Sequence, residues 1–202
     1  MDLKIWMAYF VASWAIALSP GSGAVLSMTH GLSHGVKKTS ATIAGLQVGL
    51  AVILLVAGVG VGALLLASAT AFMVVKFAGA GYLICLGIKQ WRAAVSSTVD
   101  AVVAPTVVPS ARERFLTGFF TNVTNPKGIV FMVAVLPQFI DPQRALWLQL
   151  LILLATTIAV DLIVMHGYAF LASRMQAWLD TARARRAQNG VFGGVLRAMR
   201  TS

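Results

Sequence analysis

The sequence predicts an all-α, multi-pass membrane protein, and three observations support that prediction. Hydrophobic residues make up 58% of the 202-residue chain and charged residues only 11%, which is far from the composition of a soluble globular domain. Several apolar stretches reach the length of about 20 residues that crosses a bilayer as a helix. Two of these stretches contain a helix-breaking motif near their middle, Ser19-Pro20-Gly21 and Asn125-Pro126-Lys127.

The first predicted helix covers residues 5–28 and contains the first of these motifs. Proline removes a backbone donor and disrupts the helix, so carbonyl groups are freed at the depth of the membrane. Such a break is tolerated where it packs against protein or lines a wet cavity. The break therefore indicates a candidate binding site.

Five further helices are predicted along the chain, over residues 40–66, 70–90, 115–137, 145–172 and 187–199. The helix over 115–137 contains the second break. The last segment is short for a span and contains three glycines and Arg197. The prediction is thus five to six transmembrane helices in a single domain over residues 1–202.

Residues 92–112 form the predicted linker, because the content of Ser, Thr, Val and Pro in this stretch, with two prolines, indicates an extended connection. The linker divides the chain into halves, about 1–91 and 113–202, of three helices each. An odd number of helices per half inserts the second half upside down, which is the inverted-repeat plan of many secondary transporters. Breaks at corresponding places in helices 1 and 4 of such a 3+3 repeat indicate a transporter's binding site.

Basic residues gather in the odd-numbered loops of this arrangement. Loops 2 and 4 hold only Lys76 and Arg144. Ten basic residues fall in the odd loops, namely Lys37, Lys38, Lys89, Arg92, Arg112, Arg114, Arg174, Arg183, Arg185 and Arg186. The positive-inside rule therefore predicts odd loops in the cytoplasm and the N-terminus outside. The same distribution accounts for the net charge of +10 without a nucleic-acid partner.

Two charged residues lie at the expected depth of the membrane. Asp161 is near the centre of the helix over 145–172, where a charge costs about 2.5–3.5 kcal/mol on insertion scales and should face the interior with a partner. Lys127 follows the second break at a similar expected depth and is the candidate partner, with snorkelling towards an interface as the alternative. Asp161 is interpreted as a proton carrier, with a structural ion pair or a buried neutral acid as the alternatives.

Gly45 and Gly49 form a G-x-x-x-G motif, whose small surface lets another helix approach closely. The motif predicts packing either within the chain or between subunits, so it is compatible with a homodimer. Gln47 lies beside it. Its side chain is either an interhelical hydrogen-bonding group or a ligand for a substrate.

Other residues suggest rival functions or none. Ser22 and His166 would form the dyad of an intramembrane serine hydrolase, and a non-transporting assembly subunit is a further alternative. His30 and His34 are spaced for a metal pair on a helix, but no third ligand is evident. Neither a metal, a cofactor nor a catalytic residue is predicted.

Taken together, these motifs resemble the LysE/RhtB family of bacterial amino-acid exporters over nearly the whole chain. The segments that carry the resemblance are Ser19-Pro20-Gly21, Gly31 to Lys37, Gly45 with Gly49, Gly79-Ala80-Gly81-Tyr82-Leu83 with Gly87, Asn125-Pro126-Lys127 and Leu136-Pro137-Gln138-Phe139. Ser22 stands where the family often has a second proline. The resemblance implies a protein of the bacterial inner membrane that exports amino acids or their derivatives, driven by protons, and that is not an enzyme.

An amino acid suits the charges in this chain. Its carboxylate would meet Lys127 or the positive end of a half-helix, and its ammonium would meet freed carbonyls or Asp161. The expected partners are thus an amino acid, protons and the lipid bilayer. The candidate substrate-binding or coupling residues are Ser19, Pro20, Gly21, Gln47, Asn125, Pro126, Lys127 and Asp161.

Overall fold

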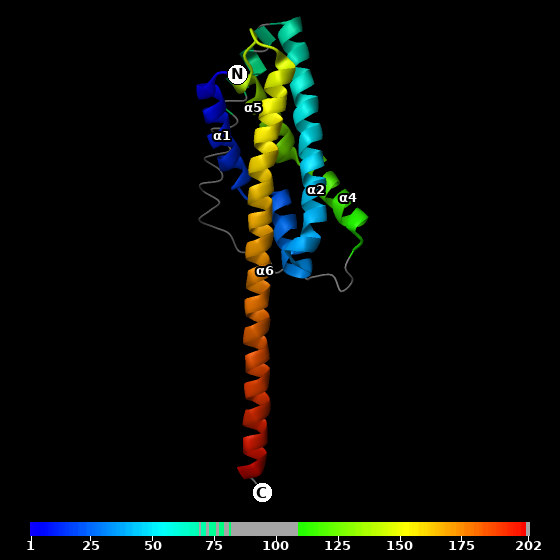
Figure 1. Ribbon diagram of the computed structural model, residues 1–202, viewed down its shortest axis with the longest axis vertical. Helices are drawn as coiled ribbons and strands as arrows, with labels where there is room; N and C mark the ends of the chain where they lie inside the picture. Colours follow the sequence, from blue (N-terminus) through cyan, green and yellow to red (C-terminus); the bar gives the residue numbers. More distant parts are fainter. Residues whose placement is uncertain (69, 72, 76, 79–80, 82–108, 201–202) are drawn as a thin grey trace.

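All secondary structure in the described part of the chain is helical (Figure 1). The computed structural model describes residues 1–200 with gaps at 69, 72, 76, 79–80 and 82–108. Most of the predicted helix over 70–90 and of the linker over 92–112 therefore lies outside the described residues. The helices are α1 (Leu3–Ala17), α2 (Ser22–Ala67), α4 (Ala111–Val123), α5 (Pro126–Phe139) and α6 (Leu146–Arg200).

The first predicted break is confirmed, but the first turn differs from the prediction. Helix α1 ends at Ala17 and α2 begins at Ser22, so the break covers 18–21. The chain then reverses direction inside α2 at Gly35, whose φ of 74° lies in the left-handed region that glycine adopts readily. His30 Nδ1 lies 2.7 Å from Thr42 Oγ1 across this turn. A single glycine thus replaces the longer loop that was predicted between 28 and 40.

The second predicted break is also confirmed. Helix α4 ends at Val123 and α5 begins at Pro126, and the two axes are bent by 54°. Asn125 is the N-cap of α5, and its side chain accepts a hydrogen bond of 3.1 Å from the amide of Lys127. Proline occupies the first helical position, where its missing N–H costs nothing.

The last two predicted helices are one continuous helix, so the predicted separation of 187–199 from 145–172 is wrong. Helix α6 runs from Leu146 to Arg200. Residues 173–186 contain neither proline nor glycine and are rich in Ala and Arg, which favour helix, so nothing ends the helix there. The apolar part that is long enough to span a membrane is Leu146–Met175.

Small residues bring α2 and α4 into backbone contact. A Cβ atom on Gly45 would lie 1.9 Å from the carbonyl oxygen of Phe115, and one on Gly118 would lie 2.1 Å from that of Thr42. Close to this crossing, the Asn122 side-chain amide donates to the carbonyl of Leu46 at 2.6 Å. The G-x-x-x-G motif therefore serves packing within the chain.

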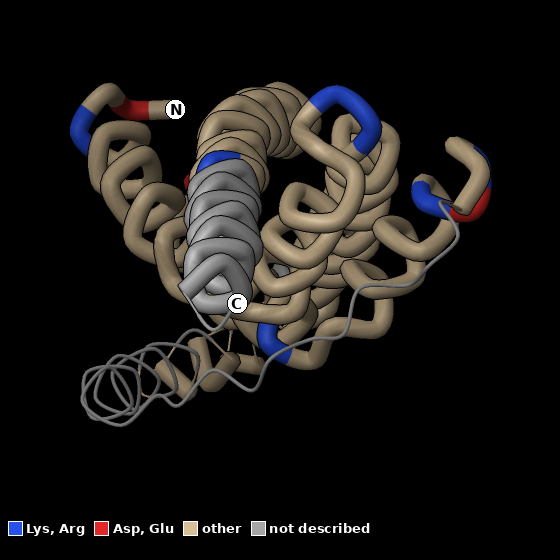
Figure 2. The backbone as a smooth tube through the Cα atoms, turned by 90° about the horizontal axis from the view of Figure 1, so that it is seen from below, with Lys and Arg blue, Asp and Glu red and all other residues tan. Residues whose placement is uncertain are grey.

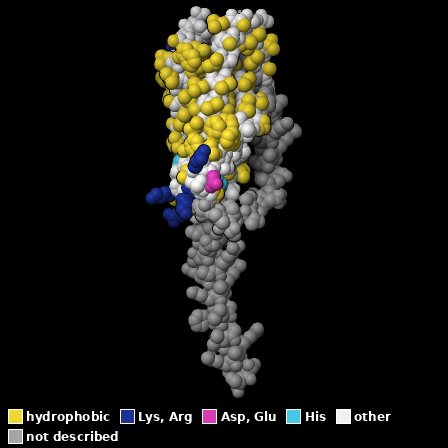
Figure 3. All heavy atoms as spheres, turned by 90° about the vertical axis from the view of Figure 1, so that its right-hand side faces the viewer, with side chains coloured by type: hydrophobic (Ala, Val, Ile, Leu, Met, Phe, Trp, Pro, Cys, Tyr) yellow, Lys and Arg dark blue, Asp and Glu magenta, His cyan; other side chains and the backbone are white. Residues whose placement is uncertain are grey.

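The described helices have the lengths and surfaces of a membrane protein. By length and composition, Ser22–Leu64 and Leu146–Met175 could cross a bilayer, and α4 with α5 counts as a third span if the bent pair is taken together. Because Ser22–Leu64 reverses at Gly35, its part after the turn, residues 36–64, is the part long enough for a full span. Figure 2 shows the helices end-on as one bundle, and Figure 3 shows a face covered by hydrophobic side chains. The charged side chains visible in Figure 3 gather at one end of that apolar face.

Two of the predicted basic loops meet at that end of the bundle. Arg114, near the start of α4, donates from Nε to the carbonyl of Lys38, just after the Gly35 turn, at 3.0 Å. Helix α1 and the first part of α2 run towards this end, whereas α4 and α5 run away from it (Figure 1). The two broken segments are therefore antiparallel.

Candidate functional site

The two helix breaks meet at a single side chain, Lys127. Its ammonium group donates to the Ser19 hydroxyl at 2.7 Å, to the Ser19 carbonyl at 3.2 Å and to the Pro20 carbonyl at 3.4 Å. The first break frees these two carbonyls from α1. A cation supplied by the second break therefore satisfies the backbone of the first.

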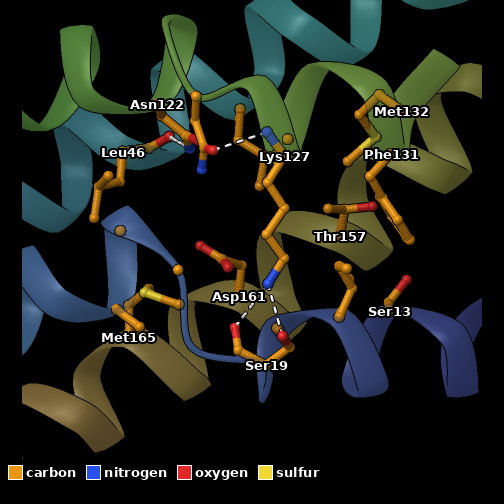
Figure 4. A pocket seen from close by; sticks show the side chains of 18 residues that line it. Ser13, Ser19, Leu46, Asn122, Lys127, Phe131, Met132, Thr157, Asp161 and Met165 are labelled. Carbon is orange, nitrogen blue, oxygen red and sulfur yellow. Dashed lines mark hydrogen bonds between the residues drawn. The ribbon is translucent and has the colours of Figure 1, made fainter. Parts of the chain in front are cut away.

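A cavity of about 90 Å³ opens beside this contact (Figure 4). One water needs about 10–15 Å³ by the same measure, so the cavity holds several waters or part of a small organic molecule. Every described helix contributes to its wall. The lining residues are Ser13, Ile16, Ala17, Ser19, Gly21, Gly23, Ala24, Leu46, Leu50, Asn122, Asn125, Lys127, Gly128, Phe131, Met132, Thr157, Asp161 and Met165.

Asp161 enters the cavity from α6, and its hydrogen-bond partner is an amide. Gln47 Nε2 donates to Asp161 Oδ2 at 2.6 Å, and the Gln47 side chain is almost completely buried. Gln47 lies one helical turn after Ile43, which belongs to the same core cluster as Val160 and Val164 of α6. This position places the Gln47 amide against the acid. The interhelical bond that was one of the two interpretations of Gln47 is thus confirmed, with the acid as acceptor.

The predicted direct pairing of Asp161 with Lys127 is wrong. The structure records no ion pair between them among the residues it describes, although both side chains line the cavity. Each charge is instead held by neutral groups, Lys127 by a hydroxyl and two carbonyls and Asp161 by the Gln47 amide. The sequence predicted that the two charges lie at a similar depth in the bundle, and both do line the cavity. It did not predict how their helices are rotated, which decides whether the two side chains meet. Both charges remain available to an opposite charge on a ligand.

Helix α2 adds a partial positive charge to the same cavity. Its N-cap is Gly21, which has no side chain to cap the first amides, and Gly23 and Ala24 of its first turn line the cavity. A helix N-terminus with free N–H groups attracts anions. The cavity therefore offers two attractions for a carboxylate, this terminus and Lys127, and one for an ammonium group, Asp161.

Most of the predicted site residues meet at this cavity. Its lining includes Ser19, Gly21, Asn125, Lys127 and Asp161. Gln47 does not line the cavity, but it hydrogen-bonds Asp161, which does. Pro20 and Pro126 shape the two breaks, but both are exposed and neither lines the cavity.

Several lining residues were not predicted. Ser13 on α1 and Thr157 on α6 place hydroxyl groups in the wall, and Asn122 on α4 adds an amide. The sequence could have indicated Thr157, because this residue lies four positions before Asp161 and so shares its face of the helix. The signal for Asn122 was its position three residues before Asn125.

The geometry gives no support to the hydrolase or the metal pair. His166 Nε2 lies 3.3 Å from Ser40 Oγ and its Nδ1 lies 2.9 Å from the Leu162 carbonyl, whereas Ser22 is exposed. The rings of His30 and His34 are stacked with centroids 5.4 Å apart. Within the described residues, no group of three side chains is arranged to hold a metal ion.

Comparison with known proteins supports the resemblance seen in the motifs. The family model for the LysE type translocator matches residues 14–199. A homoserine/homoserine lactone efflux protein of Salmonella typhi is 46% identical, over 96% of this chain and 93% of that protein. An uncharacterized membrane protein of Vibrio cholerae is 41% identical over 96% and 94%, and a leucine efflux protein of Enterobacter sp. is 31% identical over 95% and 90%. No solved structure matches the chain.

Proposed function

Because the chain belongs to the LysE type translocator family, we propose that it exports amino acids or small amino-acid derivatives across the bacterial inner membrane, coupled to protons. The observation that carries the proposal is the cavity where the two helix breaks meet, with Lys127 and Asp161 in its wall. Relatives named as efflux proteins for homoserine and for leucine support an amino-acid substrate.

The charges of the cavity suit a zwitterion. The substrate carboxylate lies between Lys127 and the N-terminus of α2, and its ammonium group lies against Asp161. Among the described residues, no opposite charge pairs with either side chain, so the substrate supplies both partners. A molecule with only one of the two charges leaves the other protein charge without a partner, which disfavours it.

The coupling proton binds to Asp161. The substrate enters from the cytoplasm while Asp161 is ionised. When the cavity opens to the outside, protonation of the carboxylate removes its attraction for the ammonium group, and the substrate leaves. The protonated carrier returns and releases its proton to the cytoplasm. An intramembrane acid in a wet cavity is suited to this role.

The two broken segments, α1–α2 and α4–α5, form an inverted pair, and the cavity lies between them. The second half lacks the separate third helix of a 3+3 repeat, because residues 187–199 continue α6. The antiparallel course of α1–α2 and α4–α5 supports this plan, as does the meeting of their breaks. Alternating access then requires one broken segment to rock against the other around the site. In this scheme the contact between Lys127 and Ser19 is remade in each cycle.

The orientation of the chain follows from its basic residues, with the Gly35 turn in the cytoplasm. Single cysteines are introduced at Lys37, next to this turn, and at Arg144, at the opposite end, in a Cys85→Ser background. An impermeant thiol reagent added to whole cells should label Arg144→Cys and spare Lys37→Cys. The reverse pattern would show that the orientation is inverted.

Proton coupling is tested by substrate efflux from reconstituted vesicles, with and without an imposed pH gradient. The gradient should accelerate efflux by the wild type but not by Asp161→Asn, because the amide cannot carry a proton. Asp141→Asn is the matched control, since Asp141 lies in the loop before α6 and bonds Arg144. Full gradient-driven efflux by Asp161→Asn would exclude Asp161 as the proton carrier.

A further inference from the structure

Two hydroxyl groups of the cavity have no part in the proposal above. Ser13 on α1 and Thr157 on α6 both line the cavity, and their side chains are only 4% and 6% exposed. They lie on the same side of Asp161, near Phe131 and Met132, whereas Met165 lies on the other side (Figure 4). This end of the cavity therefore combines two hydroxyl groups with the apolar side chains of Phe131 and Met132.

The protons of these hydroxyls are already committed. Ser13 donates to the carbonyl of Tyr9 at 2.8 Å, and Thr157 donates to the carbonyl of Leu153 at 2.8 Å. A hydroxyl has one proton and two lone pairs. What Ser13 and Thr157 present to the cavity is thus acceptor capacity alone, which suits a ligand group that carries a proton.

Tyr9 holds this arrangement in place from behind. Its hydroxyl is hydrogen-bonded to Thr157 Oγ1, and because Thr157 gives its proton to Leu153, Tyr9 is the donor. The Tyr9 side chain is 1% exposed, and its ring packs edge-on against Phe139 with centroids 5.1 Å apart. The hydroxyl of Thr157 therefore cannot turn to serve as a donor without breaking a buried contact.

The position of the hydroxyls relative to Asp161 sets the size of the ligand. Thr157 is one helical turn before Asp161, a rise of about 6 Å along α6. A ligand whose ammonium group meets Asp161 then has room for a short side chain before it reaches Thr157. Homoserine, with four covalent bonds between its ammonium nitrogen and its hydroxyl oxygen, has a matching reach.

We infer that Ser13 and Thr157 form a specificity subsite that accepts a hydrogen bond from the side-chain hydroxyl of a short amino acid. Tyr9 is the positioning residue of this subsite. The inference rests on the proposed export of amino acids and adds the feature that distinguishes one substrate from another. An apolar side chain of equal length leaves the buried acceptors without a donor, which disfavours it.

The test compares homoserine with norvaline, in which a methyl group replaces the hydroxyl. Efflux of each labelled compound is measured from vesicles that contain the reconstituted protein. The wild type should export homoserine on the order of tenfold faster than norvaline, the effect of one well-made hydrogen bond. In the double variant Ser13→Ala/Thr157→Val, this ratio should fall to about one, while norvaline efflux is kept or raised.

Thr156→Val is the matched control. Thr156 is adjacent to Thr157 and likewise donates to a carbonyl four residues earlier, that of Ile152, and accepts from α1, from Trp6 Nε1 at 3.1 Å, but it does not line the cavity. Its substitution therefore removes a similar bond between α1 and α6 outside the subsite. Its variant should keep the wild-type ratio. Tyr9→Phe should lower the ratio by a smaller factor, because Thr157 remains present but loses the donor that fixes it.

The outcomes separate the inference from the proposed function. Efflux of both compounds with an unchanged ratio in the double variant overturns the subsite and leaves amino-acid export intact. Absence of efflux of either compound from the wild type overturns the proposed function, and the subsite with it. If the double variant loses both fluxes through misfolding, the ratio in Ser13→Ala alone decides, since removing one hydroxyl from α1 leaves Thr157 and Tyr9 bonded.

Discussion

The break between α1 and α2 and the break between α4 and α5 each contain one proline, but they satisfy their backbone groups in different ways. Pro20 lies before the N-cap residue Gly21, and no side chain caps the helix that follows. Pro126 lies after the N-cap residue Asn125, which caps α5 with its own side chain. The second break caps its own helix with the Asn125 side chain. The first break depends on the Lys127 ammonium group, which comes from the second break, to satisfy its free carbonyls.

This difference assigns separate tasks to the two antiparallel segments. The first break offers the open ends of the backbone, with the Ser19 and Pro20 carbonyls on one side and the free N-terminus of α2 on the other. The second break offers a capped helix that carries Lys127 into the cavity. Two inverted segments with similar sequence motifs can thus contribute different groups to the site between them, backbone groups from one and a charged side chain from the other.

The largest effect should come from removing the cation that joins the breaks. In Lys127→Met the Ser19 and Pro20 carbonyls lose their donor, and a substrate carboxylate loses its charged partner. Hydrogen bonds to charged groups contribute about 1.5–3 kcal/mol, so vesicle efflux should fall on the order of 100-fold. Lys37→Met, at an exposed position near the Gly35 turn, should keep wild-type efflux. Full activity of Lys127→Met would show that the first break does not depend on the second.

The next effect separates the two prolines. In Pro20→Ala the chain regains a backbone donor and α1 can extend through the break, which withdraws the carbonyls that Lys127 binds. Efflux should fall about tenfold, in line with the loss of one or two hydrogen bonds. In Pro126→Ala the effect should be within about twofold, because alanine is also favourable at the first turn and Asn125 still caps α5. Equal losses in the two variants would show that the breaks are equivalent.

The features that depend on depth along the bundle could be predicted from the sequence. Both breaks, the inward position of Asp161 and Lys127 and the gathering of basic loops at one end follow from where apolar runs begin, end and are interrupted. The partner of Asp161 was not predictable in the same way. Depth places two charges at the same level, but the rotation of α6 against α2 decides that Gln47, and not Lys127, bonds the acid.

Two other features were missed for local reasons. The turn at Gly35 lies inside the predicted loop, which polar residues such as His34, Lys37 and Lys38 mark, but the sequence does not show that both helices continue up to this single glycine. Ser13 and Thr157 bond the carbonyl four residues earlier, as serine and threonine commonly do in apolar helices. Apart from the spacing of Thr157 from Asp161, the sequence does not distinguish such residues from ones that pack without a role in the site.

The cap of the second break should affect stability more than transport. In Asn125→Ala the first amides of α5 lose a side-chain acceptor, which costs about 1 kcal/mol. For a chain of this length, the melting temperature of the detergent-solubilised protein should fall by about 2–4 °C. Thr124→Val is the control, since the exposed Thr124 side chain bonds only the carbonyl of Phe120. A loss of efflux in Asn125→Ala without any loss of stability would move Asn125 from the helix cap to substrate contact.

The smallest effect should come from Ser19. Its hydroxyl is one of three groups that accept from Lys127, and the other two are backbone carbonyls that a substitution does not remove. In Ser19→Ala the ammonium group keeps both carbonyls, so efflux should fall only about threefold, the contribution of one hydrogen bond among several. Ser22→Ala is the matched control, because Ser22 is exposed three residues later and does not line the cavity. A fall in Ser19→Ala as large as that in Lys127→Met would mean that the hydroxyl, and not the broken backbone, holds the cation in place. The first break would then be an ordinary side-chain site.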